Sequence, residues 1–568
     1  AGRSFQPALW QKYEKYEMKV FKYKQLQDEE YKNGGVNLYS LIIYGGEIVD
    51  GTGAKKYKAD IAIEGDKIAA IGPDFKHCDA ETKIDANGLV VAPGFIDMHS
   101  HTDASIFRNP LAESKIMQGI TSDVTGNCGI GAFPVAENKA IELEKYLTLH
   151  NHTAPADGSR WQSFAEYADK LDTIGLGLNL VPLVAHGALR IAAMGSEDRE
   201  PTAQEMQIME ELLEQTLQEG AWGLSTGLIY PPGSFARTPE LIALSKVLAR
   251  HKTIYASHVR GESNTLLEAV DEAIRIGRES GARIEVSHLK AIGKPNWGKG
   301  IQALKNIEAA RKEGVDVAAD QYPYTATSTG LTALVPSWAH AGGVDLMLVR
   351  LADPALRERL NQDINKEMDV RGGADKVMIT SLGSNRNEHL SGKTIAEIAK
   401  VWGCAADAAV IRLLAEEEGA VGAVYFSLSD IDLEGIISNP EVSVGTDGYA
   451  LNAELDDGEA THPRSYGTFP RVLGLYVREK KLLSLETAIH KMTAFPAERL
   501  GLYDRGLIKE GLAADLTIFD PASVNDCADF INPHRYPVGI EHVIVNGRAV
   551  VAAGKVTGVG PGKVLRKK

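Results

Sequence analysis

Two histidines separated by a single residue, His99 and His101, stand directly after an apolar run at 90–97. Residues i and i+2 of a strand point to the same side, so both imidazoles can converge on one cation. Imidazole nitrogen is a common ligand of zinc in proteins. The pair therefore indicates a metal site at the end of a strand.

Four other residues suited to metal binding or proton transfer also end apolar runs: Cys128, His258, His288 and Asp447. His258 and His288 lie in matching patterns, an apolar run followed by Ser, His, an apolar residue and a cation, which indicates a shared role. A thiolate is a soft and strong zinc ligand. A carboxylate beside a divalent cation can accept a proton from water, which makes Asp447 the candidate general base and Asp320 a weaker rival.

Cationic and hydroxyl side chains gather near the same strand ends: Arg260, Lys290, Tyr322, Tyr324, Ser328, Arg464 and Arg471. In an acidic chain, cations around a metal site indicate an anionic group on the substrate, most simply a carboxylate. The partner that this pattern predicts is a small-molecule substrate.

These residues are far apart in the sequence and need a scaffold that brings them together. Strand-like runs alternate with helix-like runs, which favours a parallel sheet. The strand candidates fit an α/β fold of the (β/α)8 TIM-barrel type, in which catalytic residues lie at the C-terminal ends of the strands. An open doubly wound sheet is the structural alternative. The eight candidates are 94–101, 122–128, 179–186, 221–227, 253–258, 283–288, 316–322 and 442–447.

Both ends of the chain have a different pattern, with short β-like runs between Gly, Asp and Lys residues. Such runs predict a small β-sandwich domain built from both chain ends. A helix-rich stretch after the seventh strand is a candidate lid. The predicted order is an N-terminal helical arm or tail (1–37), the N-terminal half of the β-sandwich (38–93), the barrel (94–500) with a helical insertion at about 331–373, the C-terminal half of the β-sandwich (501–560) and a tail (561–568).

The composition argues against several classes of protein. Asp and Glu total 76 and Lys and Arg 61, a net charge of −15, and nucleic-acid binders usually carry a basic surface instead. There is no run of about 18 apolar residues, so we expect no membrane span. Four cysteines in 568 residues do not form a disulfide framework. We expect a cytoplasmic protein, with a removed export signal left open because the sequence begins at Ala1.

Several separate motifs resemble one family. They are the stretches 95–101, 126–129, 224–232, 287–290, 322–324, 446–448 and 462–471. Together they resemble the N-acyl-D-amino-acid deacylase (D-aminoacylase) group of the amidohydrolase superfamily, over residues 40–555. The resemblance implies zinc-dependent hydrolysis of the amide bond of N-acyl-D-amino acids, which yields a carboxylic acid and a free D-amino acid.

The resemblance also implies roles for individual residues. Cys128, His258 and His288 correspond to a tight zinc site, and His99 and His101 to a second site that is weaker or empty. Asp447 corresponds to the general base and Tyr230 to a phenol that holds the substrate carbonyl. Positions that hold the substrate carboxylate or side chain correspond to Arg464, Lys290, Tyr322 and Ser328.

Other functions stay open at this point. A peptidase or a cyclic amidase could use the same scaffold, although a hydantoinase-like site usually has a bridging lysine where this chain has Cys128. From a different class, the chain could be a non-catalytic scaffold protein, which would be expected to have lost metal ligands. The polar arm at 1–37 is a candidate contact for a homo-oligomer.

Overall fold

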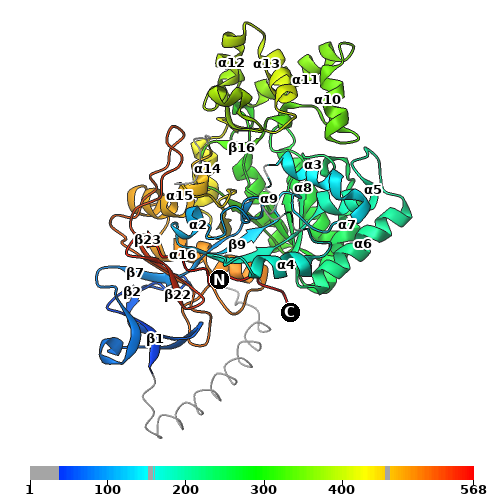
Figure 1. Ribbon diagram of the computed structural model, residues 1–568. Helices are drawn as coiled ribbons and strands as arrows, with labels where there is room; N and C mark the ends of the chain where they lie inside the picture. The colour runs from blue at the N-terminus through cyan, green and yellow to red at the C-terminus, as the bar shows by residue number, and fades with distance from the viewer. Residues whose placement is uncertain (1–37, 151, 153–157, 159, 454–460) are drawn as a thin grey trace.

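The computed structural model describes residues 38–150, 152, 158, 160–453 and 461–568 (Figure 1). The arm or tail predicted at 1–37, and the homo-oligomer contact predicted with it, lie outside the described residues. Strands and helices alternate along most of the described chain, and β-sheets also occupy its two ends.

Each predicted barrel strand overlaps an observed strand, and all the paired strands of this array run parallel. The fold is therefore of the α/β class. Two hydrogen-bonded sets make up the array. The first is β8 (Phe95–Asp97), β9 (Ile120–Thr125) and β10 (Asn179–Pro182), and the second is β11 (Val184–Ala185), β12 (Gly223–Gly227), β13 (Ile254–His258), β14 (Arg283–Val286), β15 (Val317–Gln321) and β19 (Val442–Val444).

Hydrogen bonds link the two sets at both edges. Between β10 and β11, the N–H of Leu183 donates to Thr125 O at 2.9 Å, while Trp222 N–H donates to Pro182 O at 2.9 Å. Just past β8 and β19, Met98 N–H donates to Val444 O at 3.2 Å, and Ser100 and Gly448 form a parallel bridge. The segments that carry His99 and Asp447 are therefore neighbours in space.

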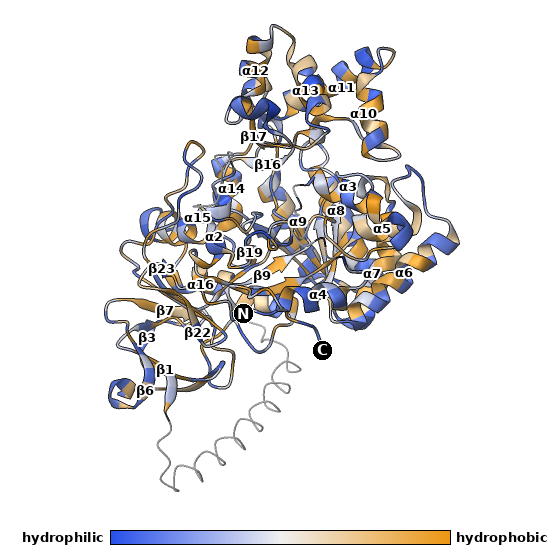
Figure 2. Cartoon of the chain, viewed as in Figure 1, coloured by the Kyte–Doolittle hydropathy of each residue, from blue (hydrophilic) through white to orange (hydrophobic). Residues whose placement is uncertain are grey.

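Helices follow the strands and cover the array: α5 (His186–Met194), α6 (Ala203–Gln218), α7 (Thr238–His251), α8 (Leu266–Ser280), α9 (Lys299–Lys312) and α14 (Asp430–Ile437). In α8, the buried residues Leu266, Val270, Ala273 and Gly277 recur every three or four positions, which places them on one face. Figure 2 shows the result, with β9 hydrophobic at the centre and outer helices such as α6 mixed in character.

The two ends of the chain share one sheet. Its order is β23 (Lys555–Val556), β22 (Arg548–Ala552), β21 (Ile540–Val545), β20 (Leu516–Phe519), β7 (Val90–Pro93), β2 (Glu47–Ile48) and β3 (Tyr57–Lys58). A second sheet has the order β5 (Lys67–Gly72), β4 (Asp60–Glu64), β1 (Tyr39–Tyr44) and β6 (Ala80–Asp85). Ile43, Ile63, Ile518 and Ile544 belong to one buried cluster, so side chains from both ends of the chain form a common core.

A separate unit, here called the insertion (residues 327–425), lies between β15 and β19 and projects at the top of Figure 1. It has its own apolar core, which includes Leu360, Ile398 and Leu413. The helices α10 (Val344–Ala352) and α11 (Arg357–Val370) fall within the predicted stretch of about 331–373, but the unit continues beyond it. It also contains an antiparallel sheet of β16 (Thr327–Gly330), β18 (Val421–Tyr425) and β17 (Val377–Leu382), with α12 (Ile395–Trp402) and α13 (Ala406–Glu416).

Among the helices of the described residues, none combines the length and the hydropathy that a membrane crossing requires. The last residues of the chain run beside β10 and the start of β12. Leu565 N–H donates to Leu180 O at 2.8 Å, and Lys567 N–H donates to Gly220 O at 2.8 Å.

Candidate metal centre

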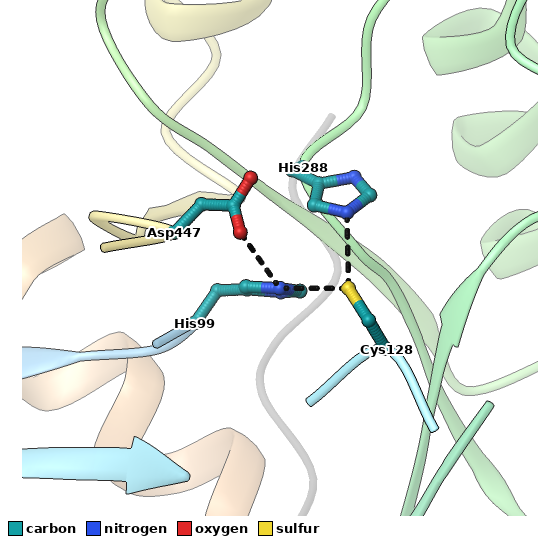
Figure 3. Close-up of side chains that lie close together, drawn as sticks. All are labelled: His99, Cys128, His288 and Asp447. Atoms are coloured by element: carbon teal, nitrogen blue, oxygen red, sulfur yellow. Dashed lines mark hydrogen bonds and ion pairs between the residues drawn. The ribbon is translucent and has the colours of Figure 1, made fainter. Parts of the chain in front are cut away.

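The thiol of Cys128 lies at the centre of a ring of imidazoles. Its Sγ atom is 3.4 Å from His99 Nε2, 3.6 Å from His258 Nδ1 and 3.4 Å from His288 Nε2. All four side chains are buried, and they follow or end β8, β9, β13 and β14. Figure 3 shows Cys128 with His99, His288 and Asp447. The parallel strands therefore bring together candidate metal ligands that are up to 189 positions apart in the sequence, from His99 to His288.

The backbone around these residues is unusual. Cys128, His288 and Asp447 have φ values of 57°, 35° and 50°, in the left-handed region that non-glycine residues rarely adopt. A Cβ atom at Gly126 would lie 2.4 Å from Leu183 O, so only glycine fits at the start of the turn that carries Cys128. Backbone strain of this kind clusters at functional sites.

Asp447 connects the imidazoles to a guanidinium. Its Oδ1 is 3.1 Å from His101 Nε2 and 3.6 Å from His99 Nε2, and its Oδ2 is 2.7 Å from Arg464 Nη1. Burial opposes ionisation, but Arg464 and His288 hold the pKa of the Asp447 carboxyl well below its usual value. The carboxylate is therefore charged at neutral pH.

Cys128 is also held in its charged form. Burial favours the neutral thiol, but His99 and His288 hold the pKa of the Cys128 thiol well below its usual value. A thiolate, a carboxylate and imidazoles form a donor set that suits zinc. Sulfur and imidazole nitrogen bound to one tetrahedral zinc ion lie about 3.6 Å apart, given bonds of about 2.3 and 2.0–2.1 Å. The distances from Cys128 Sγ, 3.6 Å to His258 Nδ1 and 3.4 Å to His288 Nε2, match that separation, so these residues fit the metal.

Carboxylates lie behind the imidazoles, on the nitrogens that face away from Cys128. Asp320 Oδ1 is 3.6 Å from His99 Nδ1, and the carboxylate of Glu262 is 3.4 Å from His258 Nε2 and 3.3 Å from His288 Nδ1. Such partners orient metal-binding histidines. Asp320, the rival for the general base, thus contacts the His99 ring. It also accepts a hydrogen bond from the backbone N–H of His288 at 2.8 Å. Sequence reasoning missed Glu262, for which its spacing four residues after His258 was the available signal.

The other predicted site residues surround this cluster. The ring of Tyr230 lies 5.0 Å from that of His258, and its hydroxyl is 2.9 Å from Thr329 Oγ1. Arg464 stacks over Tyr322 at 4.8 Å and donates to Ser328 O at 3.1 Å. The ammonium of Lys290 is 2.8 Å from His288 Nδ1 and is also paired with Glu262.

A cavity of about 470 Å³ opens over the cluster, within the usual range for small-molecule sites. Among the residues to which the family resemblance assigns a role, all but the buried His99 line it. Part of the wall comes from the insertion, through Arg371, Thr380 and Gly422. The candidates Arg260, Tyr324 and Arg471 do not line it, and the two arginines instead pair with Glu272 and Asp526.

The model of the protein family described as “Amidohydrolase family” matches residues 82–551 of the chain. The chain belongs to the amidohydrolase family. This amidohydrolase is 38% identical over 532 residues to an N-acyl-D-glutamate deacylase of Alcaligenes xylosoxydans xylosoxydans, covering 93% of this chain and 96% of the relative. It is 37% identical over 535 residues to a D-aminoacylase of the same organism, covering 93% and 98%.

A solved structure of a deacylase has a similar fold to this amidohydrolase. The N-acyl-D-glutamate deacylase of Bordetella bronchiseptica, in complex with zinc and a phosphonate inhibitor, matches with a TM-score of 0.78 at 36% identity. The match covers 93% of this chain and 100% of that one. The predicted resemblance to the D-aminoacylase group is confirmed, and the chain is an enzyme of a family that hydrolyses amide bonds.

Proposed function

We propose that this amidohydrolase is a zinc-dependent N-acyl-D-amino-acid deacylase, which releases a carboxylic acid and a free D-amino acid. One observation carries the proposal. A thiolate-centred donor set, an ionised carboxylate and a guanidinium face one cavity of about 470 Å³. The similarity to an N-acyl-D-glutamate deacylase and to a D-aminoacylase supports the same reaction.

In this proposal Cys128, His258 and His288 hold a tightly bound zinc ion. His99 and His101 would belong to a second and weaker site, as the family resemblance implies, and both lie close to Asp447, at 3.6 and 3.1 Å. Zinc supplies Lewis acidity toward a carbonyl oxygen and makes water acidic enough to act as a nucleophile near neutral pH.

Asp447 is the proposed general base. It accepts one proton from the attacking water and returns that proton to the amide nitrogen, so that the amine leaves neutral. Its ion pair with Arg464 keeps it ionised before the reaction, and its position beside His101 directs one oxygen toward the imidazole cluster.

Tyr230 is the proposed donor to the carbonyl oxygen of the substrate. Burial and the charge of Cys128 raise the pKa of the Tyr230 phenol well above its usual value, so that the hydroxyl keeps its proton. A donor fixed in advance stabilises the negative charge that develops on the oxygen during attack.

The substrate carboxylate is assigned to Arg464, which Tyr322 and Ser328 hold in place. A guanidinium can bind a carboxylate through two parallel hydrogen bonds. Lys290 adds positive charge to the same cavity while it pairs with Glu262. Fixing the carboxylate and the amide at two points lets the cavity wall distinguish the D- from the L-enantiomer.

We further propose that the parallel strands close into a (β/α)8 barrel, supported by the hydrogen bond from Met98 to Val444 and the bridge from Ser100 to Gly448. The proposed division is a barrel over 94–500 flanked by the two halves of the β-sandwich at 38–93 and 501–560. The insertion (327–425) then forms one wall of the active site.

A single experiment tests the proposed function. Purified protein is assayed against a panel of N-acyl-D- and N-acyl-L-amino acids, with N-acyl dipeptides and hydantoins included, while zinc is counted per chain. We expect zinc-dependent release of D-amino acids only. Preferred cleavage of dipeptides or hydantoins would favour the other hydrolases, and no hydrolysis with substoichiometric zinc would indicate a non-catalytic scaffold.

A further inference from the structure

Arg371 differs from every other buried arginine among the described residues. Its side chain is 8% exposed, its guanidinium stacks over the ring of Tyr425 at 4.8 Å, and its Nε has no hydrogen-bond partner. The other buried arginines each pair with a carboxylate: Arg190 with Glu240, Arg464 with Asp447, Arg499 with Glu285 and Arg505 with Asp515. Within the described part of the chain, Arg371 has no such pair.

The fold fixes Arg371 at one wall of the cavity. Arg371 follows α11 directly, and Gly372 and Gly373, with φ values of 103° and 102°, turn the chain toward β17. The preceding carbonyl, Val370 O, packs so closely on the loop after β14 that a Cβ at Gly293 would lie 2.2 Å from it. That loop also carries His288 and Lys290. Arg371 is thus anchored against the metal-site loop as well as against its own helix.

The β16–β18 ladder relates Arg371 to the reaction centre. The guanidinium of Arg371 lies over the ring of Tyr425, and Tyr425 pairs with Thr327 in the ladder. Directly paired residues in an antiparallel ladder share one face of the sheet. Thr329 points to the same face as Thr327, about 7 Å further along the strand, and its hydroxyl contacts Tyr230. One face of the β16–β18 ladder therefore contacts Tyr230 through Thr329 and contacts Arg371 through Tyr425.

A buried cation without a counter-charge is costly, and the cost is removed when an anion binds. Arg371 and Thr327 both line the cavity of about 470 Å³, and the Thr327 hydroxyl also has no partner among the described residues. A guanidinium and a hydroxyl together suit a carboxylate. The substrate α-carboxylate is already assigned to Arg464, so the group at Arg371 must be a second one.

We propose that Arg371 and Thr327 form a subsite for a second carboxylate of the substrate, either on the amino-acid side chain or on the acyl group. The proposal rests on the proposed deacylase function and adds the substrate class, a dicarboxylic N-acyl-D-amino acid. The ion pair forms only when such a substrate binds, and the carboxylate keeps its charge throughout.

Two matched pairs of substrates test the subsite. N-acetyl-D-glutamate is compared with N-acetyl-D-glutamine for a carboxylate on the side chain, and N-succinyl-D-alanine with its terminal amide for a carboxylate on the acyl group. The variants are Arg371→Met and Arg371→Lys. The control is Arg412→Met, because Arg412 stacks on Trp402 at 4.1 Å in the same insertion but does not line the cavity.

We expect wild-type enzyme to prefer the charged member of at least one pair. Arg371→Met should lower kcat/KM for that member about 10- to 100-fold, mainly through KM, and change its neutral partner less than about threefold. Arg371→Lys should recover some of the loss, and Arg412→Met should behave as wild type. Equal losses for charged and neutral substrates, or no preference in the wild type, would overturn the subsite.

Binding of glutarate and of its diamide, measured by calorimetry on the same proteins, separates this proposal from the deacylase function. Tighter binding of glutarate that depends on Arg371, without any hydrolysis, would support the subsite and exclude the deacylase. Hydrolysis of neutral N-acyl-D-amino acids together with weak, Arg371-independent glutarate binding would support the deacylase function and overturn the subsite.

Discussion

Oδ2 of Asp447 lies 2.7 Å from Nη1 of Arg464, and both side chains are more than nine-tenths buried. The proposed base and the proposed carboxylate anchor are therefore in direct contact. Under the proposed function, the substrate carboxylate would share Arg464 with Asp447, which would place the α-carbon of the substrate close to the base. Binding and proton transfer would then be coupled through one guanidinium.

Replacing Asp447 by asparagine should leave zinc binding intact but lower kcat about 10²- to 10⁴-fold, because the amide cannot accept the proton of the attacking water. Zinc content and kcat are measured on the same preparation. The control is Asp526→Asn, which alters a partly buried carboxylate that is paired with Arg471 outside the cavity. Full activity in the Asp447 variant would remove this residue from the mechanism.

Replacing Arg464 by alanine should raise KM for N-acetyl-D-amino acids about 10- to 100-fold, because a charge-assisted hydrogen bond to the carboxylate is lost. Arg471→Ala is the matched control, since Arg464 and Arg471 each stack over a tyrosine at 4.8 Å but only Arg464 lines the cavity. An unchanged KM in a correctly folded Arg464 variant would show that the carboxylate binds elsewhere.

Glu262 faces the outer nitrogens of His258 and His288, at 3.4 and 3.3 Å. Glu262→Gln should weaken zinc binding about 10- to 100-fold, because the amide orients the two imidazoles less firmly. Zinc affinity is measured by competition with a chelator. Glu272→Gln, which alters a carboxylate paired with Arg260, should bind zinc as wild type does. If both variants held zinc equally well, Glu262 would have no orienting role.

Lys491 lies fully buried on α16 (Leu485–Met492) and donates to the carbonyls of Ile437 and Asn439. Burial lowers the pKa of Lys491 to about 7. In the unfolded chain a lysine titrates near 10.4, so between about pH 7 and 10.4 only the unfolded state keeps the proton. The stability of the folded state therefore rises with pH across this window.

Lys491→Met removes that dependence. The free energy of unfolding of the wild type, relative to the variant, should be about 2 kcal/mol larger at pH 9 than at pH 7. Urea unfolding of both proteins at the two pH values gives this difference. If the difference in unfolding free energy between wild type and variant were the same at pH 7 and pH 9, Lys491 would titrate alike in the folded and unfolded states.

The portion of the site that sequence could predict is the portion made of strand ends. Cys128, His258 and His288 each follow an apolar run, and parallel strands in register bring such positions to one edge, within 3.6 Å here. Glu262 and Arg371 were missed because their places depend on loops and on the end of a helix in the insertion. For Glu262 the one local signal was its spacing four residues after His258, whereas no local pattern indicates where the end of α11 packs.

The insertion itself was predicted only in its helical region. Its runs at 377–382 (β17) and 421–425 (β18) are apolar and short. β18 pairs with β17 on one side and with β16 on the other, and its partner Thr327 lies 98 positions before Tyr425. Pairing over such separations is not encoded in a local window. The regular alternation of strand-like and helix-like runs is visible in a local window. This is why each predicted barrel strand overlaps an observed strand.

The sheet shared by the two ends of the chain has a consequence for synthesis on the ribosome. β7, at residues 90–93, pairs with β20, at residues 516–519, so it lacks this neighbour while more than 400 residues are translated. β7 is thus an early strand that gains its last partner only near the end of synthesis. The valines of β7, Val90 and Val91, must be kept from other chains until the polypeptide is almost finished.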